Sequence, residues 1–201
     1  MKKGWAIAAN ALIVLMELAV LWQAIRDGFF KCLQYYTIDS NLLQLAASCW
    51  ALFLLIGKGR LTKAAARLRF VAACCLAVTM VTVLAILAPK HGYGFLLWGH
   101  MQQFSHLLCP ILSILSLILF EKTPELPGRT VLLPGLVTLV YGAVMLALNL
   151  VRLADGPYFF LKVYERTAAE TVMYILAVLL IVAAFSALIY LLRRGRRRKQ
   201  N

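Results

Sequence analysis

The chain has 201 residues, of which 63% are hydrophobic, and its mean hydropathy is +0.83. Soluble domains are about 45–50% apolar, so this composition excludes an ordinary soluble protein and predicts an all-α, polytopic membrane protein. The formal net charge of +13 does not indicate a nucleic-acid partner, because the charges lie in loops and at the C-terminal end rather than on one face.

Six stretches are apolar over about 20 residues, the length that crosses a bilayer as a helix. They are residues 5–25, 35–56, 68–88, 98–120, 130–150 and 168–192. The first is longer than the apolar core of a signal peptide and no Ala-x-Ala site follows it, so we interpret it as a retained span. We expect one transmembrane helix bundle over residues 1–192 and a basic tail over 193–201.

The distribution of basic residues predicts the orientation. Counted on alternate sides of the membrane, 15 of the 21 Lys and Arg residues fall on the side of the two termini, including five in the 57–69 loop. The positive-inside rule then places both termini in the cytoplasm, as an even number of spans also requires. The basic tail is expected to lie on anionic headgroups. We expect a multi-pass protein of the bacterial cytoplasmic membrane with lipids as partners, and the sequence indicates no oligomeric state.

The second span begins with a polar island, Tyr-Tyr-Thr-Ile-Asp-Ser-Asn-Leu-Leu, at residues 35–43. At 100° per residue, one helical face carries most of the polar side chains of this span. These are Thr37, Ser40, Asn41, Gln44 and Ser48. Asp39 points nearly opposite. Lipid does not favour a polar face, so we expect it to point into the bundle or into a wet cavity.

A second island, Gln-Gln-Phe-Ser-His-Leu-Leu-Cys-Pro at 102–110, lies in the fourth span. Pro110 cannot donate a hydrogen bond to the His106 carbonyl, so we expect a kink near His106 that either opens a pocket or only serves packing. Thr37 and His106 differ in depth by roughly 9 Å at 1.5 Å per residue, close enough to meet in the outer leaflet.

Other ionisable residues give weaker signals. Glu17, in the outer half of the first span, could orient a histidine, take a proton, or make an interhelical hydrogen bond. The five cysteines have neither CxxC nor Cys/His metal spacing, and the three histidines are scattered. We therefore expect no metal site and no cofactor.

The island at 35–43, followed at a span's distance by Ser-His-Leu-Leu-Cys-Pro-Ile-Leu at 105–112, resembles a pattern in bacterial six-pass membrane proteins of unassigned role. More distantly, it is similar to the androgen-induced protein family of intramembrane threonine hydrolases. That family cleaves fatty-acid esters of hydroxy fatty acids, and the resemblance implies a nucleophile at Thr37 and its partner at His106. The segment at 156–162 is similar to an aromatic-proline loop of the bacterial relatives, with Lys162 where an acid is usual.

The leading hypothesis is a lipid ester hydrolase or acyltransferase acting on a fatty-acid ester. His106 would deprotonate Thr37, because a hydroxyl is a poor nucleophile until a base removes its proton. Asn41, one turn below Thr37, is the candidate oxyanion donor, and Glu17 is a candidate orienting residue. The alternative is a non-enzymatic transporter, channel subunit or lipid-binding module, in which the polar faces line a path or join helices.

Overall fold

The computed structural model describes residues 2–198, and the side chains of residues 3–196. The regular structure in this part of the chain is entirely helical, with no β-strand. Its helices are α1 (Lys2–Arg26), α2 (Phe29–Cys32), α3 (Tyr36–Lys58), α4 (Lys63–Thr82), η1 (Val83–Leu87), α5 (Ala88–His91), α6 (Tyr93–Trp98), η2 (Phe104–Leu108), α7 (Cys109–Leu119), η3 (Gly128–Val131), α8 (Leu132–Leu150), η4 (Phe159–Leu161) and α9 (Ala168–Arg198). The expected basic tail continues α9 as far as Arg198, and its last three residues lie outside the described residues.

Within residues 2–198, five helical stretches are long and apolar enough to cross a membrane. They are Lys3–Arg26, Tyr36–Lys58, Lys63–His91, Gly128–Leu150 and Ala168–Arg196. The class predicted from composition, an α-helical multi-pass membrane protein, is therefore confirmed.

The stretch predicted as the fourth span, residues 98–120, is not one helix. Helix α6 ends at Trp98, and the chain turns through His100, whose φ is +49°. The apolar helix that follows, Phe104–Leu119, is about 24 Å long at 1.5 Å per residue, against a hydrocarbon core of about 30 Å.

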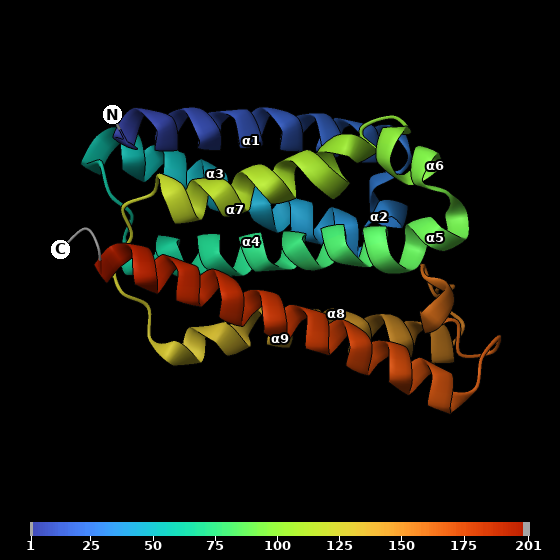
Figure 1. Cartoon of the computed structure of the whole chain (residues 1–201). Coiled ribbons are helices and arrows are strands. Elements are labelled where there is room, and N and C mark those ends of the chain that lie inside the picture. The colour runs from blue at the N-terminus through green and yellow to red at the C-terminus, as the bar shows by residue number, and fades with distance from the viewer. Residues whose placement is uncertain (1, 199–201) are drawn as a thin grey trace.

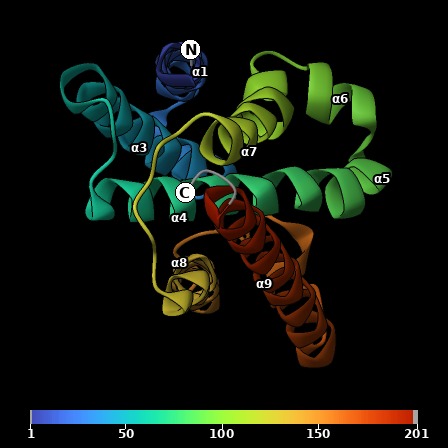
Figure 2. The same ribbon diagram turned by 60° about the vertical axis from the view of Figure 1, so that its left-hand side comes forward.

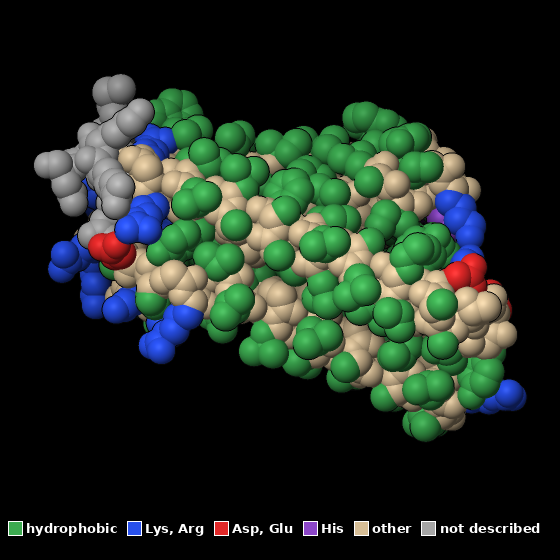
Figure 3. All heavy atoms as spheres, turned by 60° about the horizontal axis from the view of Figure 1, so that its bottom comes forward, with side chains coloured by type: hydrophobic (Ala, Val, Ile, Leu, Met, Phe, Trp, Pro, Cys, Tyr) green, Lys and Arg blue, Asp and Glu red, His purple; other side chains and the backbone are tan. Residues whose placement is uncertain are grey.

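Helix α4 is the centre of the bundle. Helices α1, α3 and α7 lie on one side of it, and α8 and α9 lie on the other (Figures 1 and 2). In α4 and its continuation to His91, 67% of the apolar stretch is buried, against 17% in the stretches that contain α8 and α9. Figure 3 shows hydrophobic side chains over the face between the two ends of the molecule, the surface that lipid tails require.

Two π-helical turns interrupt the helices, and each ends two residues before a proline. Turn η1 precedes Pro89, and turn η2 precedes Pro110. Proline has no N–H to donate to the carbonyl four residues earlier, and its ring pushes that turn aside, so the helix widens there. The distortion that Pro110 predicts thus takes the form of a wide turn that includes His106 itself.

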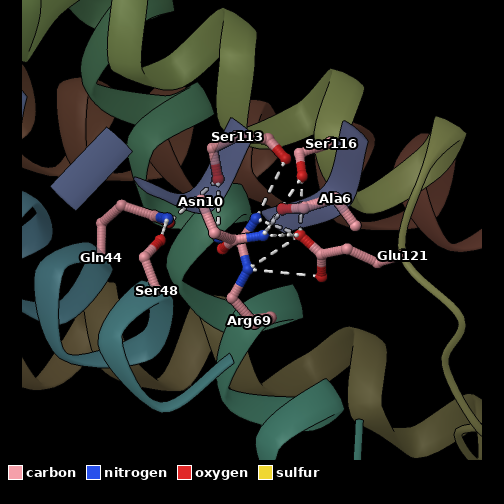
Figure 4. Close-up of polar contacts among 8 residues, drawn as sticks. All are labelled: Ala6, Asn10, Gln44, Ser48, Arg69, Ser113, Ser116 and Glu121. Atoms are coloured by element: carbon pink, nitrogen blue, oxygen red, sulfur yellow. Dashed lines mark hydrogen bonds and ion pairs between the residues drawn. The ribbon is translucent and has the colours of Figure 1, made fainter. Parts of the chain in front are cut away.

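A buried polar network joins four helices (Figure 4). Arg69 of α4 lies 2.7 Å from Glu121, measured from Nη2 to Oε1, and both side chains are fully buried. Asn10 of α1 donates to the same carboxylate oxygen at 3.0 Å. Arg69 also donates to Ser113 of α7 at 3.1 Å, and the Ser113 hydroxyl donates to Gln44 of α3 at 2.9 Å. The polar residues of α3 thus serve the packing of the bundle at this level.

The assignment of Arg69 to a loop, made in the count of basic residues, is wrong. Helix α4 begins at Lys63, so Arg69 lies in its second turn, where its side chain turns inward. A count along the sequence cannot distinguish an inward-facing arginine near a helix end from a loop arginine. The bias of basic residues toward the end where α1 begins and α9 ends remains without Arg69, and Figure 3 shows Lys and Arg side chains gathered at one end of the molecule.

Candidate functional site

Thr37 lies at the amino end of α3, where it is the second helical residue. The residue before the helix, Tyr35, makes no side-chain cap. The first free amides are satisfied from elsewhere in the chain: the Tyr36 N–H donates to the Tyr141 hydroxyl at 3.0 Å, and the Thr37 N–H donates to the Tyr158 hydroxyl at 3.4 Å. Thr37 is therefore held at the positive end of a helix dipole, a position that favours developing negative charge.

Tyr158 reaches Thr37 because the 156–162 loop is tightly folded. A Cβ at Gly156 would lie 2.6 Å from the carbonyl carbon of Leu161, so only glycine permits this approach. The Tyr158 ring stacks on Phe160 with ring centroids 5.3 Å apart. Burial raises the pKa of Tyr158 to about 12, so its phenol stays protonated at neutral pH and can donate a hydrogen bond.

His106 is buried in turn η2, with 7% of its surface exposed. Its Nδ1 lies 2.7 Å from the carbonyl oxygen of Leu96 in α6. A carbonyl can only accept, so this contact places the proton on Nδ1 and leaves the lone pair on Nε2. The ring is thus oriented by a backbone group, in the tautomer that a general base requires.

Thr37 and His106 line the same cavity, which has a volume of about 820 Å³. Its wall includes Tyr158 and ionisable side chains from short helices and loops at this end of the bundle: Asp27, Lys31, Lys90, His91, His100, Lys162 and Glu165. Lys162, at the position where the resemblance leads one to expect an acid, pairs with Glu165 three residues later at 3.0 Å. An acid is therefore present at this part of the cavity, although displaced along the chain.

Thr37 also lines a second cavity, of about 210 Å³, between α4, α8 and α9. The walls of this second cavity are almost entirely apolar, with side chains such as Leu146, Ile175 and Leu179. Thr37, Val83, Leu87 and Tyr158 line both spaces. Thr37 thus stands where a polar cavity meets an apolar one.

The two supporting candidates, Asn41 and Glu17, make contacts other than those expected of them. The Asn41 Nδ2 donates to the Thr37 carbonyl at 2.6 Å and to the Ser105 carbonyl at 3.4 Å, so it joins α3 to the backbone beside His106. Its amide hydrogens are directed at the backbone, and its role as an oxyanion donor stays a prediction that requires the amide to turn. Glu17 is buried beside the Cys109 thiol, and the His106 Nδ1 bonds to Leu96 instead.

Asp39 behaves as the helical phase predicts. It lines a separate cavity of about 520 Å³ together with Phe30 and Val144, on another side of α3 from His106.

Sequence reasoning missed Tyr158 and the Leu96 carbonyl. The only sequence signal for the position of Tyr158 is Gly156, two residues earlier, which marks a close backbone approach. A main-chain carbonyl leaves no signal in the sequence.

Among the described residues, no group of three or more His, Cys, Asp or Glu side chains is arranged to hold a metal ion. No protein-family model matches the chain, and neither a curated protein nor a solved structure is detectably similar to it. Any functional assignment therefore depends on the geometry of the site.

Proposed function

We propose that the protein crosses the bacterial cytoplasmic membrane six times, with Phe104–Leu119 as the short fourth span and both termini in the cytoplasm. Two observations support this topology. Helix α1 begins and helix α9 ends at the same end of the bundle, as an even number of crossings requires (Figure 1). That end also carries most of the basic residues, which remain preferentially on the cytoplasmic side.

We further propose that the protein is a membrane-embedded acyl hydrolase that cleaves fatty-acid esters, with Thr37 as nucleophile and His106 as base. The observation that carries this proposal is that Thr37 and His106 line one cavity while Thr37 also borders an apolar one. A lipid ester needs both environments. Its acyl chain fits the apolar space beside Leu146 and Leu179, and its polar part fits the cavity that contains His106.

The proposed reaction begins with His106 neutral at Nε2 and the Thr37 hydroxyl protonated. The Nε2 of His106 accepts the proton of the Thr37 hydroxyl as Oγ1 forms a bond to the ester carbonyl carbon. The tetrahedral intermediate collapses when the carbon–oxygen bond to the alcohol breaks, and His106 returns the proton to that alcohol. A water molecule, deprotonated by His106, then hydrolyses the acyl-threonine and releases the fatty acid. An acceptor alcohol in place of water would make the same site an acyltransferase.

Tyr158 is the group best placed to stabilise the oxyanion. Its hydroxyl already lies 3.4 Å from the Thr37 amide nitrogen and carries a proton at neutral pH. The amino end of α3 adds a favourable dipole at the same point. Loss of one oxyanion-hole donor typically costs about 10²–10³ in kcat.

The alternative is a lipid-binding module that performs no chemistry. The apolar cavity favours it, because such a space holds an acyl chain whether or not an ester is cleaved. The two functions make opposite predictions for a substitution that removes only the hydroxyl of Thr37.

The test is hydrolysis of p-nitrophenyl decanoate by the purified protein in detergent. We expect Thr37→Ala to reduce the rate to the detergent background, and Thr37→Ser to retain part of it because the hydroxyl survives. His106→Ala should lower the rate by about 10²–10⁴-fold, as expected when a general base is lost.

Asp39→Asn is the matched control, since Asp39 lies on the same helix but lines a different cavity. Its rate should stay close to that of the wild type. If Thr37→Ala hydrolyses the ester as fast as the wild type, the hydrolase is excluded and the lipid-binding alternative takes its place.

A further inference from the structure

A second polar cavity, of about 600 Å³, lies where α3 and α7 end, whereas turn η2 with His106 stands at the beginning of α7. It is enclosed by the last turns of α3 and α7, the two loops that follow them, and the C-terminal part of α9. The residues that line it do not overlap with those of the cavity around Thr37. We name it the basic pocket.

The charge of the basic pocket is strongly positive. Six cationic side chains line it: Lys58, Arg60, Lys63, Lys122, Arg193 and Arg196. One carboxylate, Glu121, also lines it, but its oxygens accept hydrogen bonds from the buried Arg69. Burial alone would raise the pKa of Glu121, but the Arg69 charge and the hydrogen bonds outweigh this and hold the pKa below its usual range. Glu121 thus compensates the buried Arg69 and does not neutralise Lys58, Lys63 or Lys122 of the pocket.

Hydrogen bonds between the loops fix the walls of the basic pocket. The Leu61 N–H donates to the Lys122 carbonyl at 3.1 Å, which joins the loop after α3 to the loop after α7. The Arg193 Nη2 donates to Thr123 at 2.6 Å, which joins α9 to the same loop. The cations are therefore brought together by bonded backbone segments, and a ligand would meet a largely preformed site.

The beginning of α4 adds a second indication of an anion. Thr62 caps this helix by accepting from the Ala65 N–H at 3.3 Å. The first turn contains Lys63 and no acidic residue. A cation at the amino end of a 20-residue helix opposes the helix dipole, whereas an anion bound beside Lys63 would be stabilised by both.

The other half of the basic pocket is apolar. Its wall is formed by the end of α7, residues 117–120, of which Leu119 is 37% exposed. A fully hydrophilic anion makes no favourable contact with an apolar wall, whereas a lipid carries both a charged headgroup and hydrocarbon chains. We propose that the basic pocket binds the phosphate group of an anionic membrane lipid, with the lipid's acyl chains against the end of α7.

The test is binding of fluorescent phosphatidylglycerol to the purified, delipidated protein in neutral detergent. Phosphatidylcholine with the same acyl chains serves as the zwitterionic comparison, and inorganic phosphate serves as a competitor. We expect tight binding of phosphatidylglycerol, weak binding of phosphatidylcholine and no competition by millimolar phosphate. Lys63→Gln combined with Lys122→Gln should weaken phosphatidylglycerol binding about 30-fold, because each basic residue near a lipid surface contributes about a factor of five.

Arg129→Gln combined with Arg194→Gln is the matched control. Both arginines are exposed, lie at the same end of the bundle and are absent from the wall of the basic pocket. Equal loss of binding in this control would show that the attraction is diffuse and would overturn the site. Equal binding of phosphatidylcholine, or displacement by inorganic phosphate, would overturn the assignment to an anionic lipid.

Discussion

Replacing Glu121 by glutamine should strongly destabilise the bundle, because it leaves Arg69 buried without a counter-charge. Arg69 and Glu121 have fully buried side chains, and their closest atoms are 2.7 Å apart. Arginine does not lose its proton in a protein, so the charge remains after the substitution. Breaking a buried ion pair in this way typically costs about 3–5 kcal/mol.

The geometry indicates why glutamine cannot replace the carboxylate. Oε1 of Glu121 accepts from Arg69, Asn10 and Ser116 at 2.7, 3.0 and 2.9 Å. A glutamine keeps one carbonyl oxygen for these donors, but its NH₂ group turns two further donors toward the guanidinium. For a domain of this size, a loss of 3–5 kcal/mol corresponds to a decrease in Tm of roughly 6–20 °C.

The measurement is thermal unfolding in detergent, followed by tryptophan fluorescence. A double variant, Arg69→Met with Glu121→Gln, removes both charges and should be more stable than Glu121→Gln alone. Asp155→Asn, at an exposed loop position, is the control and should leave Tm nearly unchanged. Two results would contradict this reasoning: Glu121→Gln unfolding at the wild-type Tm, or the double variant unfolding at a lower Tm than Glu121→Gln. Either would show that the buried Arg69–Glu121 pair does not stabilise the contact between these helices.

Three further predictions concern pH, topology and the site. The pKa of Glu121 lies below its usual 4.5 in the folded protein. The stability that its ion pair with Arg69 contributes should therefore be complete above pH 4.5 and should be lost as the pH falls through the folded-state pKa. Melting curves recorded from about pH 7 down to about pH 3 measure this loss. A cysteine introduced at Arg60, in a background without native cysteines, should react with an impermeant maleimide only after cells are opened, and labelling of intact cells would reverse the orientation. Tyr158→Phe should lower kcat for ester hydrolysis by about 10²–10³-fold with little change in KM, and an unchanged kcat would remove Tyr158 from the oxyanion site.

Much of the fold follows from the sequence, because a bilayer leaves few choices to an apolar chain. Apolar length predicted the stretches around α1, α3, α4, α8 and α9, and helical phase separated Asp39 from the face of Thr37. The interruption before Phe104 was missed because Gln102 and Gln103 were interpreted as part of a polar island within a span, whereas the chain turns just before them at His100.

The contacts that complete the site could not be predicted in the same way. Tyr158 meets Thr37 across 121 residues, and Arg69 meets Glu121 across 52 residues. Neither pair has a local spacing that indicates contact, because the meeting depends on how α4 arranges the two sides of the bundle. Thr37 and His106 were accessible to sequence reasoning because each is a polar residue within an apolar stretch, where an unpaired polar group is costly.

The most direct test of the proposed chemistry is the mass of the protein during turnover. The protein is mixed with p-nitrophenyl decanoate, quenched in acid within the first turnovers, digested and analysed by mass spectrometry. We predict a decanoyl group on Thr37 in the wild type, on the serine in Thr37→Ser, and on no residue in Thr37→Ala. Hydrolysis that proceeds with no acyl group at residue 37, or an acyl group that persists elsewhere in Thr37→Ala, would contradict the account.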